Sequence, residues 1–478
     1  MTWTTWVWVW GAIVVAVELL GVLMAVDAIM RGRSAQGAVA WGLSLVTFPW
    51  LALPLYIVFG QRKFYGYVDA RRSGDLEIND IAVRLQEHAP AFEAALDDER
   101  PALRVMAHMA KMPFTNQNDA TLLVDGGATF DAIFDQIARA NDYVLVQKYI
   151  LRDDGLGRRF KAALIDRARA GIRVYLLFDE IGCSELPNTY LSDLREGGVD
   201  AQPFKTARGL RNRFRLNFRN HRKIVIVDGT VAIVGGLNVG DEYAGEDDKL
   251  GAWRDTSVML QGPAVQCVQL SFLEDWYWAM RQVPELNWLP RPVEQVDRRA
   301  LVLPTGPADD IESCGLFFVQ AIESARERLW IGTPYFVPDA SVVSALQLAA
   351  MRGVDVRIML PHKADHPIVQ LAAYSFLEET VPAGVKLYRY QPGFMHQKVM
   401  LIDDDVATVG TANMDNRSFR LNFELTIVIA DADFSGQVQR MLEHDLSQSR
   451  LFTVEHLAHR SIFFKFAVRF ARLLAPVL

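Results

Sequence analysis

Two long apolar runs dominate the first sixty residues of the chain. In residues 3–26 the only ionisable side chain is Glu18, and residues 35–60 contain none. Each run is long enough to cross a hydrocarbon core of about 30 Å as a helix. A cleaved signal peptide would begin with positive charge, and the first ten residues carry none. The pattern therefore predicts a hairpin of two transmembrane helices.

Three residues within these runs qualify that prediction. Pro49 and Pro54 would kink the second span or mark its emergence from the membrane. Glu18 costs about 2.5 to 3.5 kcal/mol inside a span, so we expect it to face the partner helix, a second copy of the chain or a polar cavity. Its role and the oligomeric state stay open, with a homo-oligomer among the alternatives.

The basic residues beside the two runs predict their orientation. Two arginines, Arg31 and Arg33, lie between the runs. Four basic residues follow the second run, namely Arg62, Lys63, Arg71 and Arg72. Cytoplasmic flanks are enriched in Lys and Arg, so the count places the C-terminal bulk on the cytoplasmic side.

Beyond residue 118 short apolar runs alternate with helical periods, which predicts an α/β fold with a mostly parallel or mixed sheet. The expected strands include Tyr143–Tyr149, Ile172–Phe178, Ile224–Val227, Leu329–Ile331, Val354–Leu360 and Val399–Ile402. Similar segments recur in the same order, since 171–174 matches 353–356 and 198–199 matches 384–385. The repeat indicates one duplicated unit.

The chain therefore divides into five predicted parts. These are two transmembrane helices (1–60), a juxtamembrane linker (61–118), a first domain (119–295), a second domain (296–455) and a basic amphipathic C-terminal helix (456–478). In the last part Lys465, Arg469 and Arg472 share one helical face, and large apolar side chains cover much of the remainder. A helix lying in the membrane interface and an ordinary core-packing helix are both open.

Each half contains one copy of the same spaced set of polar residues. The sets are His221, Lys223, Asp228 and Asn238, and His396, Lys398, Asp403 and Asn413. In both, Lys follows His by two positions, Asp follows Lys by five, and Asn follows His by seventeen. On a strand the His and Lys project from one face and can converge on one phosphate. The Asp can order a turn or balance the lysine, and the Asn offers an amide donor.

Such a set suits phosphodiester exchange. One imidazole attacks phosphorus, and the other protonates the leaving alcohol and then deprotonates the incoming one. Lysines and asparagines stabilise the phosphoryl oxygens, the task of a divalent ion elsewhere, so we expect no metal and no cofactor. An imidazole pKa near neutrality suits both roles, and the lysines must stay charged. A symmetric pair does not identify the nucleophile; we prefer His221, with His396 as acid and base.

Charge narrows the choice of partner. The 57 acidic residues outnumber the 50 basic ones, which disfavours a globally basic nucleic-acid binder. The stretch 205–223, however, holds eight basic residues and no acidic one, interleaved with apolar side chains. We expect it to bind anionic headgroups, with a solvated face or a nucleic-acid groove as alternatives. Histidines without repeated spacing are treated as structural or surface residues: His88, His108, His362, His366, His444, His456 and His459.

The two motifs resemble the signature of the phospholipase D superfamily, and the chain is more narrowly similar to bacterial cardiolipin synthases. The matching segments are 219–223, 235–243, 253–255, 393–398 and 410–418. The resemblance implies two tandem phospholipase D-like α/β/α sandwich domains that form one pseudo-twofold catalytic unit behind the transmembrane hairpin. In the family an acidic residue downstream of each motif orients the histidine of the opposite half, and Asp255 and Glu424 match those positions.

The implied reaction transfers a phosphatidyl group from one phosphatidylglycerol to another and yields cardiolipin and glycerol, in a multi-pass protein of the bacterial inner membrane. Phosphatidylglycerol and cardiolipin would be its partners, and nucleic acid would not. A phospholipase D-type hydrolase, or a transferase that uses another alcohol, shares the chemistry. A nuclease with these motifs would not need two spans, and a non-catalytic scaffold would not need six reactive side chains.

Overall fold

The computed structural model describes residues 2–32, 35–60, 67, 81, 90–96, 100–204, 217–245, 251–453, 455 and 460–478. They belong to two compact units, one of Met1–Tyr65 with Thr206–Phe218 and the other of Gly66–Lys205 with Arg219–Leu478. Much of the predicted linker, the basic residues 205–216 and residues 456–459 of the predicted C-terminal helix lie outside the described residues.

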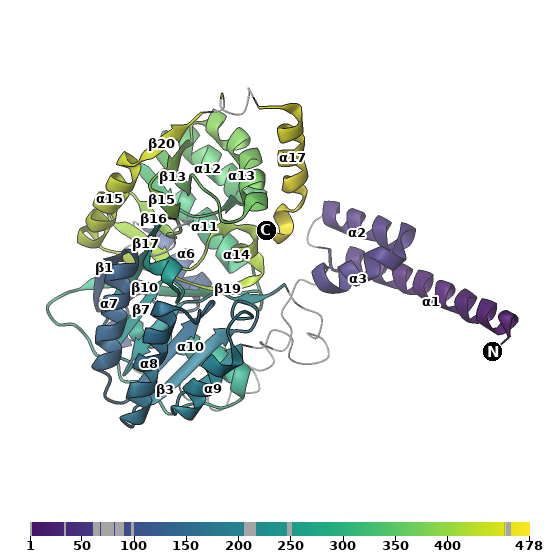
Figure 1. The fold of residues 1–478 in the computed structure, drawn as a ribbon. Helices are drawn as coiled ribbons and strands as arrows, with labels where there is room; N and C mark the ends of the chain where they lie inside the picture. Colours follow the sequence, from purple (N-terminus) through teal and green to yellow (C-terminus); the bar gives the residue numbers. More distant parts are fainter. Residues whose placement is uncertain are drawn as a thin grey trace. The chain divides into compact units, whose positions relative to one another are not determined.

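The first unit contains α1 (Trp3–Met30), α2 (Ala35–Thr47) and α3 (Pro49–Phe59). Within the described part of the chain, α1 is the one helix long and apolar enough to cross a membrane (Figure 1). The Tyr56 hydroxyl of α3 donates a hydrogen bond to Asp27 of α1 at 2.9 Å. Gly21 lets α1 approach α2 closely, because a Cβ there would lie 2.4 Å from the Leu45 carbonyl oxygen.

The second apolar run forms two helices rather than the single helix expected over residues 35–60. Phe48 leaves the helical conformation, with φ −136° and ψ 56°, between α2 and α3. The cause is Pro49, because a proline ring disfavours helical dihedrals in the residue before it. At 13 and 11 residues, α2 and α3 are each shorter than the roughly 20 residues that one span requires.

In the described residues of the second unit, one mixed sheet of 16 strands runs through both halves. The first half supplies β1 (Thr115–Val124), β2 (Tyr143–Lys148), β3 (Arg173–Asp179), β4 (Asp200–Phe204), β5 (Arg219–Asn220), β6 (Ile224–Val227), β7 (Val231–Gly235) and β9 (Thr256–Gln261). The second half supplies β10 (Arg298–Thr305), β11 (Arg328–Gly332), β13 (Asp355–Pro361), β14 (Lys386–Tyr390), β16 (Val399–Ile402), β17 (Val406–Gly410), β19 (Asn422–Ala430) and β20 (Ser449–Phe452).

The order of the strands confirms the predicted duplication. β1 and β10 pair antiparallel at the junction of the halves. Outward from that junction the order is β9-β7-β6-β2-β3-β4 on one side and β19-β17-β16-β11-β13-β14 on the other, where β20 adds an edge strand. The expected ranges of β6 and β16 match the structure, and the other predicted strands differ by a residue or two at their ends.

Helices cover both faces of the sheet, as expected for an α/β/α arrangement (Figure 1). The first half has α7 (Asp125–Ala138), α8 (Gly155–Arg169), α9 (Asn188–Glu196) and α10 (Ala264–Met280). The second half has α11 (Ser313–Ser324), α12 (Ala340–Met351), α13 (Pro367–Thr380), α14 (Asn416–Arg420) and α15 (Ala432–Ser447). Side chains alternate along each strand, so in β3 Val174 and Leu176 join the core beneath α7 to α9, whereas Tyr175 meets Trp276 of α10.

Helix α17 (Ile462–Leu473) near the C-terminus has one packed face and one exposed apolar face. Val468 and Ala471 are buried, and Arg469 pairs with Glu378 of α13 at 2.6 Å, so one face packs on the second half. The opposite face leaves large apolar side chains exposed, with Phe463 83% and Phe466 71% exposed. The basic residues therefore serve partly in ion pairs with α13.

Candidate active site

One cavity of about 430 Å³ brings the two motifs together. His221 and Asn238 of the first half line it with His396 and Asn413 of the second. The two motif lysines lie directly behind the histidines and are almost wholly buried. Each lysine donates a hydrogen bond to the carbonyl oxygen of the histidine two residues before it, at 2.7 Å for Lys223.

Short parallel strand pairs carry each histidine to the opposite half. β5 pairs with the start of β19, and β15 (Gly393–Met395) pairs with β8 (Ala252–Arg254). The His221 amide donates to the Phe423 carbonyl at 2.9 Å, and the His396 amide donates to the Arg254 carbonyl at 2.7 Å. The next residues after these acceptors are Glu424 and Asp255, so each half delivers a carboxylate to the other half's histidine.

The two histidines make equivalent contacts with these carboxylates. His221 Nδ1 lies 2.9 Å from Glu424 Oε2, and His396 Nδ1 lies 2.8 Å from Asp255 Oδ2. A carboxylate accepts the proton on Nδ1, which leaves the lone pair of a neutral ring on Nε2. Burial raises the pKa of both acids, but the adjacent histidines and motif lysines outweigh it and hold each pKa below its usual value.

Burial also changes the proton affinity of the bases. It lowers the pKa of both imidazoles to about 4, although the paired carboxylates oppose the change. It lowers the pKa of Lys398 to about 8 and that of Lys223 well below its usual value. The expectation from the sequence that the imidazole pKa lies near neutrality is therefore corrected. That expectation ignored the loss of water around the buried rings.

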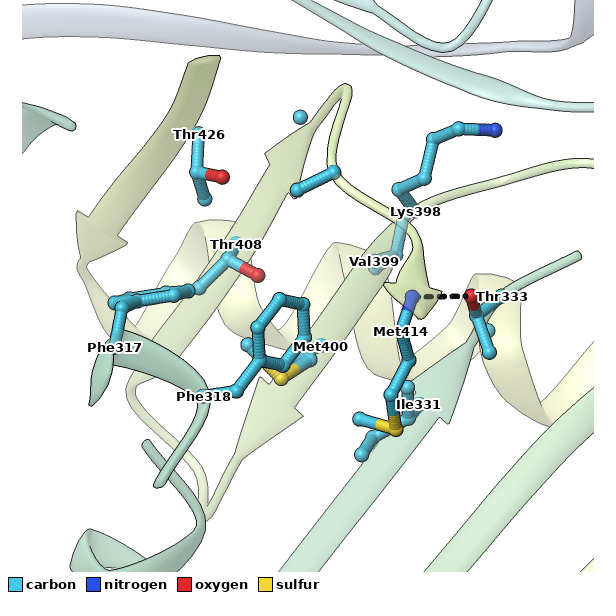
Figure 2. A pocket seen from close by; sticks show the side chains of 13 residues that line it. Phe317, Phe318, Ile331, Thr333, Lys398, Val399, Met400, Thr408, Met414 and Thr426 are labelled. Atoms are coloured by element: carbon cyan, nitrogen blue, oxygen red, sulfur yellow. Dashed lines mark hydrogen bonds between the residues drawn. The ribbon is translucent and has the colours of Figure 1, made fainter. Parts of the chain in front are cut away.

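Figure 2 shows a small, mostly apolar pocket that Lys398 lines together with Phe318, Met400 and other side chains. The amine of Lys398 points away from the apolar side chains of this pocket. Nearby, the backbone amide of Met414 donates to the Thr333 hydroxyl at 3.2 Å.

The structure does not bring the two motif aspartates to the cavity. Asp228 follows β6 with φ +53° and accepts hydrogen bonds from the backbone amides of residues 141–143 at 2.9 Å. Asp403 follows β16 with φ +52° and accepts from the amides of residues 326–328 at 2.8 to 3.1 Å. Of the two roles left open by the sequence, the contacts fit the ordering of a turn and not the balancing of a lysine.

A further buried lysine escaped the sequence analysis. Lys148 ends β2, is 4% exposed, and donates to the Leu237 carbonyl at 3.2 Å. Burial lowers its pKa to about 7, while the charge of Asp255 opposes this change. The corresponding residue of the second half is Thr333, so this amine has no counterpart there. The signal was a lone charged residue at the end of a largely apolar strand.

The rest of the wall contains polar residues that motif spacing did not identify. Tyr149, Arg219, Tyr335, Asp365, His366 and Arg417 all line the cavity. The Tyr335 hydroxyl donates to Asp365 Oδ2 at 2.5 Å. His366, expected to be a structural or surface residue, is exposed but belongs to this wall. The loops after β11 and β13 place Tyr335, Asp365 and His366 in this wall, whereas Tyr149, Arg219 and Arg417 reach it from the end of β2, from β5 and from α14.

Comparison with known proteins agrees with this architecture. The family model described as "Cardiolipin synthase, PLD-like domain" matches residues 133–276 and 318–446. The chain is 47% identical over 472 residues to cardiolipin synthase A of Pseudomonas putida strain KT2440, covering 98% of each chain. It is 46% identical over 482 residues to cardiolipin synthase A of Pseudomonas aeruginosa strain LESB58, covering 100% of this chain and 97% of that one.

The fold is also similar to a solved structure of low sequence identity. Phosphatidylserine synthase of Haemophilus influenzae Rd KW20 matches with a TM-score of 0.58 at 14% identity. The match covers 79% of this chain and 100% of the other. At that identity the likeness concerns the fold alone.

Proposed function

The chain belongs to the cardiolipin synthase family with phospholipase D-like domains, and from this premise we propose that it transfers a phosphatidyl group from one phosphatidylglycerol to another. The products are cardiolipin and glycerol. The observation that carries the proposal is the pairing of His221 with Glu424 and of His396 with Asp255 at one cavity. Two imidazoles held in this way supply a nucleophile and an acid–base group to one phosphorus.

In the first step, His221 Nε2 attacks phosphorus, the P–N bond forms, and the P–O bond to the headgroup glycerol breaks. His396 gives the departing glycerol oxygen its proton. In the second step, His396 takes the proton of the incoming glycerol hydroxyl, the new P–O bond forms, and the P–N bond breaks. Asn238, Asn413 and the motif lysines stabilise the charge on the phosphoryl oxygens.

The pKa directions fit this sequence of events. A neutral imidazole is the nucleophile, and burial keeps both rings neutral at pH 7. The acid must carry a proton, and an anionic phosphodiester beside His396 would raise the pKa of that ring. The same anion would favour the charged form of Lys223 and Lys398. Binding of the substrate anion would therefore favour the protonated form of His396 and the charged forms of both lysines at the same time.

Membrane attachment completes the proposal. The 28 residues of α1 suffice for one span, and α2 with α3 would form a second crossing broken at Phe48. The excess of Lys and Arg residues after the second apolar run favours a catalytic unit on the cytoplasmic side. The exposed face of α17 would add an interfacial contact. Truncation before Ser461 should then weaken binding to vesicles that contain phosphatidylglycerol, and labelling of single cysteines in intact cells would report the orientation.

The decisive experiment uses purified protein and labelled phosphatidylglycerol as the sole lipid. Cardiolipin with released glycerol supports the proposal. Phosphatidic acid as the main product would instead support a phospholipase D-type hydrolase, and a product formed only with another added alcohol would support a different headgroup transferase. Protein with His396→Ala provides the matched blank.

A further inference from the structure

Two arginines from opposite halves lie together in the wall of the cavity. Arg219 is in β5, and Arg417 is in α14, directly before β19. The two residues are far apart in the sequence, but the pairing of β5 with β19 brings them close. Arg219 lies opposite Asn422 in that pairing, and the Arg219 amide donates to the Leu421 carbonyl at 3.3 Å. Both are partly buried, and both line the cavity that holds the histidines.

The two guanidinium groups are close enough to affect each other. Burial, and next the charge of Arg219, lower the pKa of Arg417. Asp179 and Asp415 contribute negative charge near the pair. Both arginines nevertheless line the cavity itself, and a guanidinium group can donate two parallel hydrogen bonds to a phosphate. The pair is therefore suited to an anion that enters the cavity.

The arginines also break the twofold symmetry of the cavity. Arg219 stands two residues before His221, and the corresponding residue before His396 is Phe394. Arg417 stands 21 residues after His396, and the corresponding residue after His221 is Glu242. The motif groups occur on both sides of the reacting centre, whereas the guanidinium pair occurs on one side alone. A role in binding the transferred phosphoryl group would not require this asymmetry.

Resting on the proposed function, we infer that Arg219 and Arg417 form a subsite for the phosphodiester of the second, accepting phosphatidylglycerol. Tyr149 links this subsite to the reacting centre, because its ring centroid lies 5.0 Å from that of His221 and its side chain hydrogen-bonds Arg219. One tyrosine ring thus separates the guanidinium group from the imidazole. In the product the two phosphates are separated by one glycerol, a spacer of comparable size.

The inference is tested by changing the acceptor while the donor stays the same. Exchange of labelled glycerol into phosphatidylglycerol uses the same donor and the same histidines, but its acceptor has no phosphate. Arg219→Gln and Arg417→Gln should lower cardiolipin formation about 10- to 100-fold, the loss expected when a charged hydrogen bond to an anion is removed. Glycerol exchange by the same variants should stay within about twofold of the unaltered protein.

Matched variants separate binding from folding. Arg219→Lys and Arg417→Lys should recover part of the cardiolipin activity because they keep the charge, and Arg352→Gln should leave both reactions unchanged because its exposed ion pair with Glu323 lies outside the cavity. Equal loss of both reactions, or no loss of either, would overturn the inference. If the unaltered protein exchanges glycerol but forms no cardiolipin, the proposed function fails instead.

Discussion

The two halves of the catalytic unit make the same histidine–carboxylate contact in different surroundings. Glu424 accepts hydrogen bonds from three neutral donors, Thr411 at 2.6 Å, Ser418 at 2.9 Å and Asn422 at 3.0 Å. Asp255 accepts from the Thr256 amide at 2.8 Å. Each carboxylate lies near the charge of its own motif lysine, Lys223 for Glu424 and Lys398 for Asp255, but Asp255 interacts in addition with Lys148. Duplication has preserved atomic positions but not the electrostatic environment, so equivalent placement does not make the two imidazoles interchangeable.

The largest expected effect is the loss of either histidine. His221→Ala and His396→Ala should each lower cardiolipin formation by about 10²–10⁴-fold or more, because each removes one of the two imidazoles that the proposed mechanism requires. Labelled phosphohistidine trapped on the enzyme should map to His221 alone. His444→Ala, at an exposed position of α15, serves as the control. Near-normal turnover by either motif variant would rule out the two-histidine mechanism.

Replacement of the two carboxylates, Glu424 and Asp255, should show how the surroundings of the two histidines differ. Glu424→Gln and Asp255→Asn should each reduce turnover by roughly 10–100-fold, since the imidazole loses its fixed orientation. Glu424→Gln should also cost about 1–3 kcal/mol more unfolding free energy, because three buried donors lose an ionised acceptor. Activity assays and denaturant unfolding would measure the two effects. Equal destabilisation by both variants would show that the neutral donors are unimportant.

The motif aspartates should behave alike, since their contacts are the same in both halves. Asp228→Asn and Asp403→Asn should each lower the free energy of unfolding by about 1–3 kcal/mol, because an amide cannot accept from all the backbone amides that now surround the carboxylate. Turnover by the folded fraction should stay within a few-fold of normal. A large fall in kcat without loss of stability would instead support a catalytic role for Asp228 and Asp403.

The smallest effect on turnover is expected from replacing Lys148, which belongs to neither motif and has no counterpart in the second half. Its pKa is about 7 when folded and near its ordinary value of 10.5 when unfolded, so the unfolded chain binds more protons between these values. The contribution of Lys148 to the free energy of unfolding therefore rises with pH between about 7 and 10.5 and is lowest below pH 7. Lys148→Met should raise the Tm more at pH 6 than at pH 9. A change in Tm that does not vary with pH would contradict the buried, titrating amine.

Much of the fold followed from local pattern. The repeat in sequence predicted a duplicated α/β unit, and the shared spacing pointed to the His and Asn side chains that line one cavity. Pro49 signalled the break in the second apolar run, although length alone suggested one helix. These features were accessible because each depends on neighbours in the chain or on a regular offset from a motif.

The remaining features depend on contacts between distant segments. Nothing near Asp228 in the sequence indicates that the amides of residues 141–143 converge on it. The meeting of Arg219 with Arg417 depends on the register between β5 and β19. The pKa of about 4 for the histidines depends on how completely the assembled halves exclude water. Such quantities belong to the assembled sheet and have no local signature.

The exchange of carboxylates between the halves also limits how each copy of the duplicated unit could change by mutation. His221 contacts Glu424 and His396 contacts Asp255, so under the proposed mechanism neither copy would be a self-sufficient enzyme. A chain severed between the halves should give two inert fragments that regain activity only when they reassociate. For the same reason, damage to one copy cannot be masked by the other. Under the proposed mechanism, this reciprocal dependence ties activity to the integrity of both copies, although the surroundings of the two histidines differ.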